Sequence, residues 1–139
     1  MMEKTVLSFI YNYRVAYGDT DQMGYVYYGH YARIFEMART EALRSIGLSY
    51  KTIEEMGIMM PVTNFTVRYV RPALYDDFLS VKVDVLEMPD RFMNFYYEVY
   101  NEVGEKLCEA ETKLFFVDFT SRKPVRVPKL LLDKINVHS

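Results

Sequence analysis

The stretch YGDTDQMGYVYYGHY occupies residues 17–31 and leads directly into a helical pattern. Asp19 and Asp21 stand two residues apart in it, and Gly24 and Gly29 follow. The acidic pair is therefore predicted to lie just before a helix N-terminus, where backbone N–H groups are unpaired and the helix dipole is positive. A carboxylate facing such a helix end is suited to attack on an activated carbonyl, because the free N–H groups would stabilise the oxyanion that forms.

The helix itself is predicted over residues 31–46, YARIFEMARTEALRSI. Apolar residues recur there at helical spacing, at Tyr31, Ile34, Phe35, Ala38, Ala42 and Ile46. Gly47 supplies a stop, so the helix would be roughly 25 Å long at about 1.5 Å per residue. One or two further helical turns are predicted at residues 50–57, and a short C-terminal helix after Pro128.

The remaining segments predict strands. Residues 5–17 are rich in aromatic and β-branched side chains, which favours a first strand. Apolar and polar residues then alternate over four segments, at 64–72, 79–88, 91–101 and 106–119. A hairpin turn containing Gly104 joins the last two. The pattern predicts an α+β fold in one domain over residues 1–139, with one long helix against an antiparallel sheet of about five strands.

Composition excludes several classes of protein. Half of the 139 residues are apolar, which favours a packed fold over disorder. The formal net charge of −2 argues against a nucleic-acid binder. Cys108 is the single cysteine, so no internal disulfide framework is possible. No apolar run approaches the length of a membrane span and no signal-peptide pattern opens the sequence, so a cytoplasmic protein is expected.

Several common catalytic chemistries also find no support. The sequence has no Gly-x-Ser-x-Gly elbow and no Gly-x-Gly pair, and its histidines at positions 30 and 138 do not have metal-ligand spacing. We therefore expect no cofactor and no metal. Cys108 lies among apolar neighbours in a predicted strand, which favours a packed, inert thiol over a nucleophile. His30, near the helix start, is interpreted as a surface or capping residue.

The acidic and aromatic residues also have simpler interpretations. By spacing alone, Asp19 and Asp21 are best explained as loop acids that accept hydrogen bonds from nearby backbone N–H groups. Glu36 is expected to form helix-surface pairs with Arg33 or Arg39, three residues away on either side. The four tyrosines near the helix start could simply be core side chains, namely Tyr25, Tyr27, Tyr28 and Tyr31.

The combined pattern from Asp19 to Tyr31 resembles the signature of hotdog-fold acyl-CoA thioesterases of the 4-hydroxybenzoyl-CoA thioesterase type. That signature is Asp-x-Asp-x-x-Gly-x-Val, two aromatic or His positions, two variable residues and Tyr. It stands here as Asp19, Asp21, Gly24, Val26, Tyr27, Tyr28 and Tyr31. Residues 35–47, FEMARTEALRSIG, are similar to the family's central helix, and Gly57-Ile58, Pro61 and residues 72–77 are similar to further landmarks. The resemblance covers roughly residues 10–120 and implies a hotdog fold, in which the sheet wraps the central helix.

The resemblance also implies roles for individual residues. Asp21 would be the catalytic carboxylate, which either attacks the thioester or deprotonates a water molecule. The backbone N–H of Tyr28 would polarise the thioester carbonyl. Substrate contacts are implied for Gly24, Val26, Tyr31, Met60, Val62 and Arg91. Met60 and Val62 suit an aliphatic or aromatic acyl group, whereas Arg91 stands alone where other members carry a basic cluster for the CoA phosphates.

The expected function is hydrolysis of a small or medium acyl-CoA by a homodimer or a dimer of dimers. One helix cannot cover five strands, and open sheet edges need pairing or protection, so a shared site between two subunits is expected. Two alternatives stay open, an acyl-carrier-protein thioesterase and a non-catalytic acyl-binding dimer. A hotdog dehydratase fits less well, because the motif lacks the His that such sites use. Neither the acyl group nor the choice between nucleophile and general base follows from the sequence.

Overall fold

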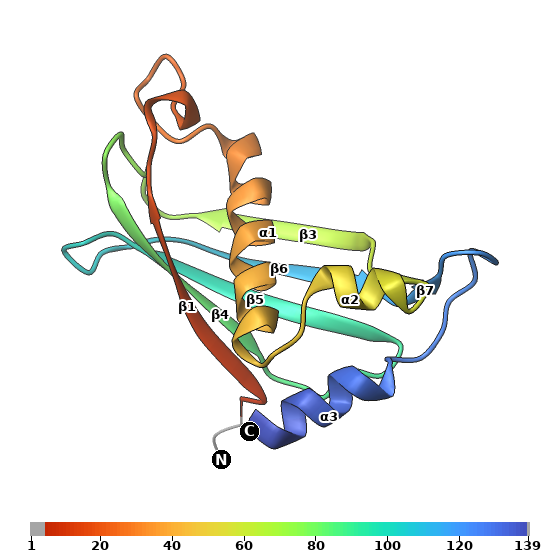
Figure 1. Ribbon diagram of the computed structural model, residues 1–139. Helices are drawn as coiled ribbons and strands as arrows, with labels where there is room; N and C mark the ends of the chain where they lie inside the picture. The colour runs from red at the N-terminus through yellow and green to blue at the C-terminus, as the bar shows by residue number, and fades with distance from the viewer. Residues whose placement is uncertain (1–4, 139) are drawn as a thin grey trace.

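The computed structural model describes residues 5–138 as a curved antiparallel sheet with a long helix across its inner face (Figure 1). The strand order is β1-β4-β5-β6-β3. These strands are β1 Leu7–Arg14, β3 Val62–Tyr69, β4 Phe78–Val85, β5 Phe92–Tyr100 and β6 Lys106–Phe115. A separate two-stranded pair joins β2 Ile58–Met59 to β7 Val117–Asp118. The helices are α1 Tyr28–Ser45, α2 Tyr50–Glu55 and α3 Lys129–His138. The predicted α+β arrangement of one long helix against five strands is confirmed.

Helix α1 begins at Tyr28, three residues before its predicted start. Its first turn contains Gly29, a poor helix former, so propensity gave no sign of it. The C-terminus follows the prediction, because Gly47 adopts φ +83°. The N–H of Gly47 donates to the Arg44 carbonyl at 2.9 Å and that of Leu48 to the Leu43 carbonyl at 3.1 Å. This pair of hydrogen bonds is a Schellman motif, which satisfies carbonyls that the helix end leaves free.

The strands agree with the predicted alternation, although their ends differ. The strand predicted at 64–72 begins two residues earlier, at Val62, and ends three residues earlier, at Tyr69. Val81, Val83 and Val85 are fully buried, while Lys82 faces solvent. The first strand stops at Arg14 because a short 3-10 turn forms at Tyr17–Asp19. The last predicted strand is divided into β6 and β7. Helices α2 and α3 form where helical turns were predicted, and α3 buries Leu131 and Ile135 in the common core.

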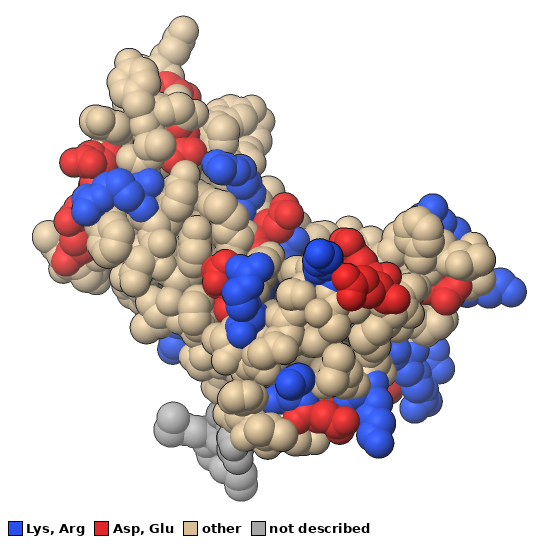
Figure 2. Space-filling model, in the orientation of Figure 1, with Lys and Arg blue, Asp and Glu red and all other residues tan. Residues whose placement is uncertain are grey.

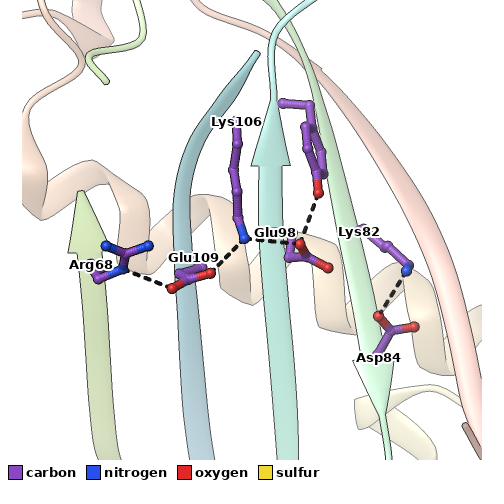
Figure 3. A network of polar contacts seen from close by, with 7 residues as sticks. Arg68, Lys82, Asp84, Glu98, Lys106 and Glu109 are labelled. Atoms are coloured by element: carbon purple, nitrogen blue, oxygen red, sulfur yellow. Dashed lines mark hydrogen bonds and ion pairs between the residues drawn. The ribbon is translucent and has the colours of Figure 1, made fainter. Parts of the chain in front are cut away.

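The outer face of the sheet is charged, in contrast to the apolar face under α1. Figure 3 shows a row of ion pairs across β3, β6 and β5, Arg68–Glu109 at 2.8 Å, Glu109–Lys106 at 2.6 Å and Lys106–Glu98 at 3.1 Å. On β4, Lys82 lies 3.6 Å from Asp84. Exposed pairs of this kind stabilise a protein only slightly, because solvent screens their charges. Their main consequence is that helix packing is confined to the opposite face.

The two sheet edges, β1 and β3, differ in how well they are covered. Helix α1 packs mainly against β1 and β4, not against β3. Phe65, Val67 and Tyr69 of β3 point toward the helix side as predicted, yet Phe65 remains 40% exposed and Tyr69 50% exposed. Their contacts with α1 are edge-on, with ring centroids 5.5 Å apart for Tyr31–Tyr69 and 6.0 Å apart for Phe35–Phe65. The apolar face at β3 is therefore incomplete in one chain.

None of the helices within residues 5–138 combines the length and the apolar character needed to cross a membrane.

Candidate active site

Asp19 anchors the loop that leads into α1. Its carboxylate is only 4% exposed, and its Oδ2 accepts hydrogen bonds from the Tyr13 hydroxyl at 2.6 Å and the Ala16 N–H at 2.8 Å. Its own carbonyl accepts from the N–H of Tyr27, the residue before the helix, at 2.9 Å. Arg33 lies 4.0 Å away. Burial, the hydrogen bond to Asp19 and the charge of Asp19 together raise the pKa of Tyr13 to about 12, so Tyr13 keeps the proton that it donates to Asp19 near neutral pH.

Asp21 uses only part of its hydrogen-bonding capacity within this loop. Its Oδ1 accepts from the N–H of Met23 at 2.9 Å and from that of Tyr25 at 3.3 Å. Gly24 closes the turn at φ +79°, a conformation that favours glycine, and donates to the Asp21 carbonyl at 3.0 Å. Within residues 5–138 no donor reaches the other carboxylate oxygen, Oδ2. Asp21 is thus a loop acid, as its spacing indicates, and keeps one oxygen available for chemistry.

A cavity of about 410 Å³ lies between the first turn of α1 and the end of β3. It is lined by Tyr25, Val26, Tyr28 and Tyr31 on one side and by Tyr69, Val70, Arg71 and Pro72 on the other. Tyr28 is the first helical residue, so its N–H has no partner within the helix. The structure therefore brings together three of the predicted site residues, Val26, Tyr28 and Tyr31, beside the Asp21 loop.

Gly24 lies in the Asp21 loop itself, whereas the three remaining predicted substrate contacts lie elsewhere in the same chain. Val62 begins β3 and Tyr69 ends it, so roughly 24 Å of strand separates them at about 3.4 Å per residue. Met60 lines a second cavity, of about 920 Å³, between α1, α2 and β2. Arg91 lines a third, of about 260 Å³, in the loop before β5. One chain alone does not assemble Met60, Val62 and Arg91 with the Asp21 loop.

A basic side chain that the sequence did not indicate lies beside the Arg91 loop. The segment between β7 and α3 contacts this loop at Asp90, whose carbonyl accepts from the Val127 N–H at 2.5 Å and whose carboxylate lies 3.8 Å from Arg126. This segment carries Arg122, Lys123 and Arg126, and basic side chains gather on that side of the molecule in Figure 2. Sequence reasoning missed this group, because its members lie more than 30 positions beyond Arg91.

Glu36 was predicted to pair with Arg33 or Arg39 on the helix surface, and neither ion pair forms within residues 5–138, where Arg33 lies 4.0 Å from Asp19 instead. Arg39 is only 8% exposed and its Nε donates to the Tyr50 hydroxyl at 3.2 Å. It lies four residues after Phe35 and three before Ala42, within the buried face of α1. This position within the run of apolar residues was the feature of the sequence that could have predicted the burial of Arg39. The interpretation of the four tyrosines as core side chains holds only for Tyr31, because the other three are exposed, namely Tyr25, Tyr27 and Tyr28.

Two further candidates have structural explanations. Cys108 is buried, as predicted for a packed thiol, and burial followed by the charge of Glu109 raises its pKa to about 12. His30, in the first turn of α1, packs edge-on against the Tyr27 ring at 5.8 Å between centroids. Across residues 5–138, no three His, Cys, Asp or Glu side chains are grouped so as to hold a metal ion.

Comparison with known proteins places this chain in a family. The sequence profile of the Thioesterase-like superfamily matches residues 15–135. The chain belongs to this superfamily. It is 34% identical to the acyl-CoA thioester hydrolase YbgC of Escherichia coli O6:H1 over 119 residues, which are 86% of this chain and 89% of YbgC.

Solved structures of related proteins have the same fold. The DHNA-CoA thioesterase from Staphylococcus aureus is 31% identical and superposes with a TM-score of 0.87 over 94% of this chain and 88% of its own. A hypothetical protein from Aquifex aeolicus is 35% identical, with a TM-score of 0.85 over 91% of this chain and 98% of its own. The predicted hotdog fold and the resemblance to hotdog thioesterases are confirmed.

Proposed function

We propose that the protein hydrolyses small or medium acyl-CoA thioesters, with Asp21 as nucleophile or general base and the Tyr28 N–H as donor to the carbonyl oxygen. The observation that carries the proposal is the free Oδ2 of Asp21 in the loop that leads into α1, whose first residue lines the 410 Å³ cavity. Membership of the Thioesterase-like superfamily supports it, as do relatives named acyl-CoA thioester hydrolase and DHNA-CoA thioesterase.

The chemistry needs only groups of this chain and water. A thioester carbonyl is electrophilic because sulfur donates little resonance to it. The Tyr28 N–H and the positive end of the α1 dipole would stabilise the oxyanion, and each such donor lowers the barrier by about 3 kcal/mol. Asp21 either attacks the carbonyl carbon, expelling CoA thiolate and leaving an anhydride that water hydrolyses, or takes a proton from the attacking water. Asp19 would hold the loop in place and take no part in proton transfer.

Assembly explains why one chain leaves its predicted site residues apart. Val70 donates to the Leu107 carbonyl across the β3–β6 ladder at 2.8 Å, and N–H directions alternate along a strand. The N–H groups of odd-numbered β3 residues therefore face away from β6, along an unpaired edge. Two β3 strands pairing antiparallel about a two-fold axis would place Val62 of a second copy opposite Tyr69. Met60 and Val62 of one copy would then border the Tyr28 cavity of the other, in a homodimer or a dimer of dimers.

Basic side chains near the Arg91 loop would form a surface that binds the phosphates of CoA. Arg126 adds positive charge beside the Arg91 loop, where it also pairs with Asp90, and Arg122 and Lys123 precede it in the same segment. CoA carries phosphates that such side chains bind. An acyl carrier protein is also acidic, so this surface suits either carrier of the acyl group.

A hydrolysis screen over acyl-CoA and acyl-carrier-protein thioesters tests the function directly. The wild-type protein, after EDTA treatment and dialysis, should release thiol from at least one acyl-CoA, and Asp21→Asn should not. Hydrolysis confined to acyl-carrier-protein substrates would favour the second carrier. Activity that disappears with EDTA and returns with Zn²⁺ or Mg²⁺ would contradict the metal-free mechanism. Binding without hydrolysis across the whole series would leave a non-catalytic acyl-binding protein.

A further inference from the structure

The 920 Å³ cavity between α1, α2 and β2 is not used by the chemistry described above. Its volume is in the range of small-molecule sites. Much of its wall is apolar and comes from Ile53, Ile58, Met60 and Pro61. Met60 connects this cavity to the proposed function, since β3 pairing would bring the Met60 end of one copy next to the Tyr28 cavity of the other. An acyl group whose carbonyl lies at Tyr28 of one copy would therefore extend into this cavity of the second copy.

Arg39 makes the cavity chemically unusual. Its guanidinium is always charged and has five N–H donors. Arg39 is 8% exposed, lines the cavity and donates from Nε to the Tyr50 hydroxyl at 3.2 Å. Among residues 5–138, no carboxylate oxygen lies within 4.0 Å of its guanidinium nitrogens. Buried charges in proteins are normally paired, so a guanidinium on this wall with no carboxylate partner indicates an oxygen acceptor supplied from outside the chain.

The carboxylates of the cavity decide which oxygen fits. Glu36 and Glu54 also line it, and both side chains are exposed. Two negative charges on the wall disfavour the burial of a third on the ligand. A neutral hydroxyl avoids this repulsion, because its oxygen can accept from Arg39 while its proton is donated to the Tyr50 oxygen or to Glu36.

We infer that Arg39 and Tyr50 determine acyl specificity, by binding a hydroxyl group at the end of the acyl chain farthest from the thioester. This inference rests on the proposed thioesterase function and names the substrate class of that site. The apolar walls would hold the hydrocarbon part of the acyl group. An acyl group of the same size without the hydroxyl would place hydrocarbon against the guanidinium donors and leave them unpaired, which costs binding energy in the transition state.

Matched substrate pairs test the inference. We would measure kcat/KM for 6-hydroxyhexanoyl-CoA against hexanoyl-CoA, and for 4-hydroxybenzoyl-CoA against benzoyl-CoA. The wild-type protein should prefer the hydroxylated member of at least one pair by about tenfold or more, the scale of a hydrogen bond to a charged group. Arg39→Met keeps the length and apolar stem of the side chain, and should abolish that preference by slowing the hydroxylated substrate alone. Tyr50→Phe should reduce it by a smaller factor.

Arg44→Met is the control, because Arg44 is an exposed arginine on the same helix that pairs with Glu41. It should leave the preference unchanged. Equal kcat/KM values for both members of each wild-type pair would overturn the inference and leave the thioesterase function intact, and this comparison requires no variant to fold. An Arg39→Met protein that slows both members equally would show a structural role and overturn it as well. If no thioester is hydrolysed by the wild-type protein, the proposed function fails, and the specificity inference fails with it.

Discussion

The two edge strands of the sheet have the same kind of sequence but different surroundings. Side chains of β1 pack under α1, where the Tyr11 hydroxyl contacts the Met37 sulfur at 3.7 Å and the Tyr13 hydroxyl is held by Asp19. The equivalent side chains of β3 have no such cover, and Tyr69 is 50% exposed. One edge is thus covered by its own chain, and the other is open and would be paired by a second copy in the proposed dimer. The loop of Asp19 and Asp21 is anchored beside β1, whereas the cavity next to it opens beside β3.

The largest effect is expected at Asp21, on the open side of the loop. Asp21→Asn removes the charge that we propose attacks the thioester or activates water, so kcat should fall by about 100-fold or more with little change in thermal stability. Steady-state kinetics on the best acyl-CoA of the screen, with circular dichroism to verify folding, would measure both. Asp19→Asn should reduce kcat much less than Asp21→Asn. If Asp19 is the more sensitive of the two, the roles within the pair are assigned the wrong way round.

The next effect concerns the β3 edge itself. Val67→Pro removes a central N–H that faces away from β6, so it should prevent strand pairing between copies while leaving the β3–β6 ladder in place. Light scattering at low micromolar concentration should give at least twice 16.5 kDa for the wild-type protein and 16.5 kDa for the variant. The variant should also lose activity, because each site would lack Met60 and Val62 from the second copy. Val67→Ala, which keeps the N–H, should remain dimeric, and a fully active monomer would refute the shared site.

The difference between the edges also separates what could be predicted from sequence. Local patterns located the long helix, its Gly47 stop and the alternation of Val81, Val83 and Val85, because each depends on neighbours within a few residues. The coverage of each edge was not predictable, since the strand order places β3 at one side through pairing with β6, about 45 positions later in the sequence. Phe65 and Tyr69 therefore have the alternation of a buried strand and the exposure of an open one.

The site was predictable to a similar degree. The spacing of Asp19 and Asp21 located the loop. It did not indicate which of the two carboxylates would accept hydrogen bonds that hold the fold together, because the donor to Asp19 is Tyr13, which comes from a strand. The prediction for Arg39 was wrong for a related reason. Pairing at i±3 holds for residues on the solvent side of a helix, whereas Arg39 lies on the apolar face and its partner Tyr50 comes from another helix.

A moderate effect is expected on the anchored side of the loop. Tyr13→Phe removes one donor from a carboxylate that is 4% exposed, which should lower the free energy of unfolding by about 1–3 kcal/mol. Urea denaturation would measure it. Tyr11→Phe is the matched control two residues earlier on β1, because its hydroxyl contacts only a weakly accepting sulfur, and it should change stability much less. A loss of kcat as large as that of Asp21→Asn, without loss of stability, would place Tyr13 in the chemistry rather than in the anchor.

The smallest effect on activity is expected at Cys108, which lies next to the open β3 edge but is buried. It lies opposite Tyr69 of β3 in the ladder and is fully buried, and burial followed by the charge of Glu109 raises its pKa to about 12. At pH 8 a thiol of that pKa is only about one part in ten thousand thiolate, against roughly a quarter for an ordinary cysteine. Iodoacetamide should therefore label the folded protein far more slowly than the urea-unfolded protein at this pH. Labelling of the folded form should keep rising toward pH 12, whereas that of the unfolded form should level off above about pH 9. Cys108→Ala should retain wild-type kcat, and rapid labelling at pH 8 that abolishes hydrolysis would mean that the β3 side opens to solvent much further than the structure shows.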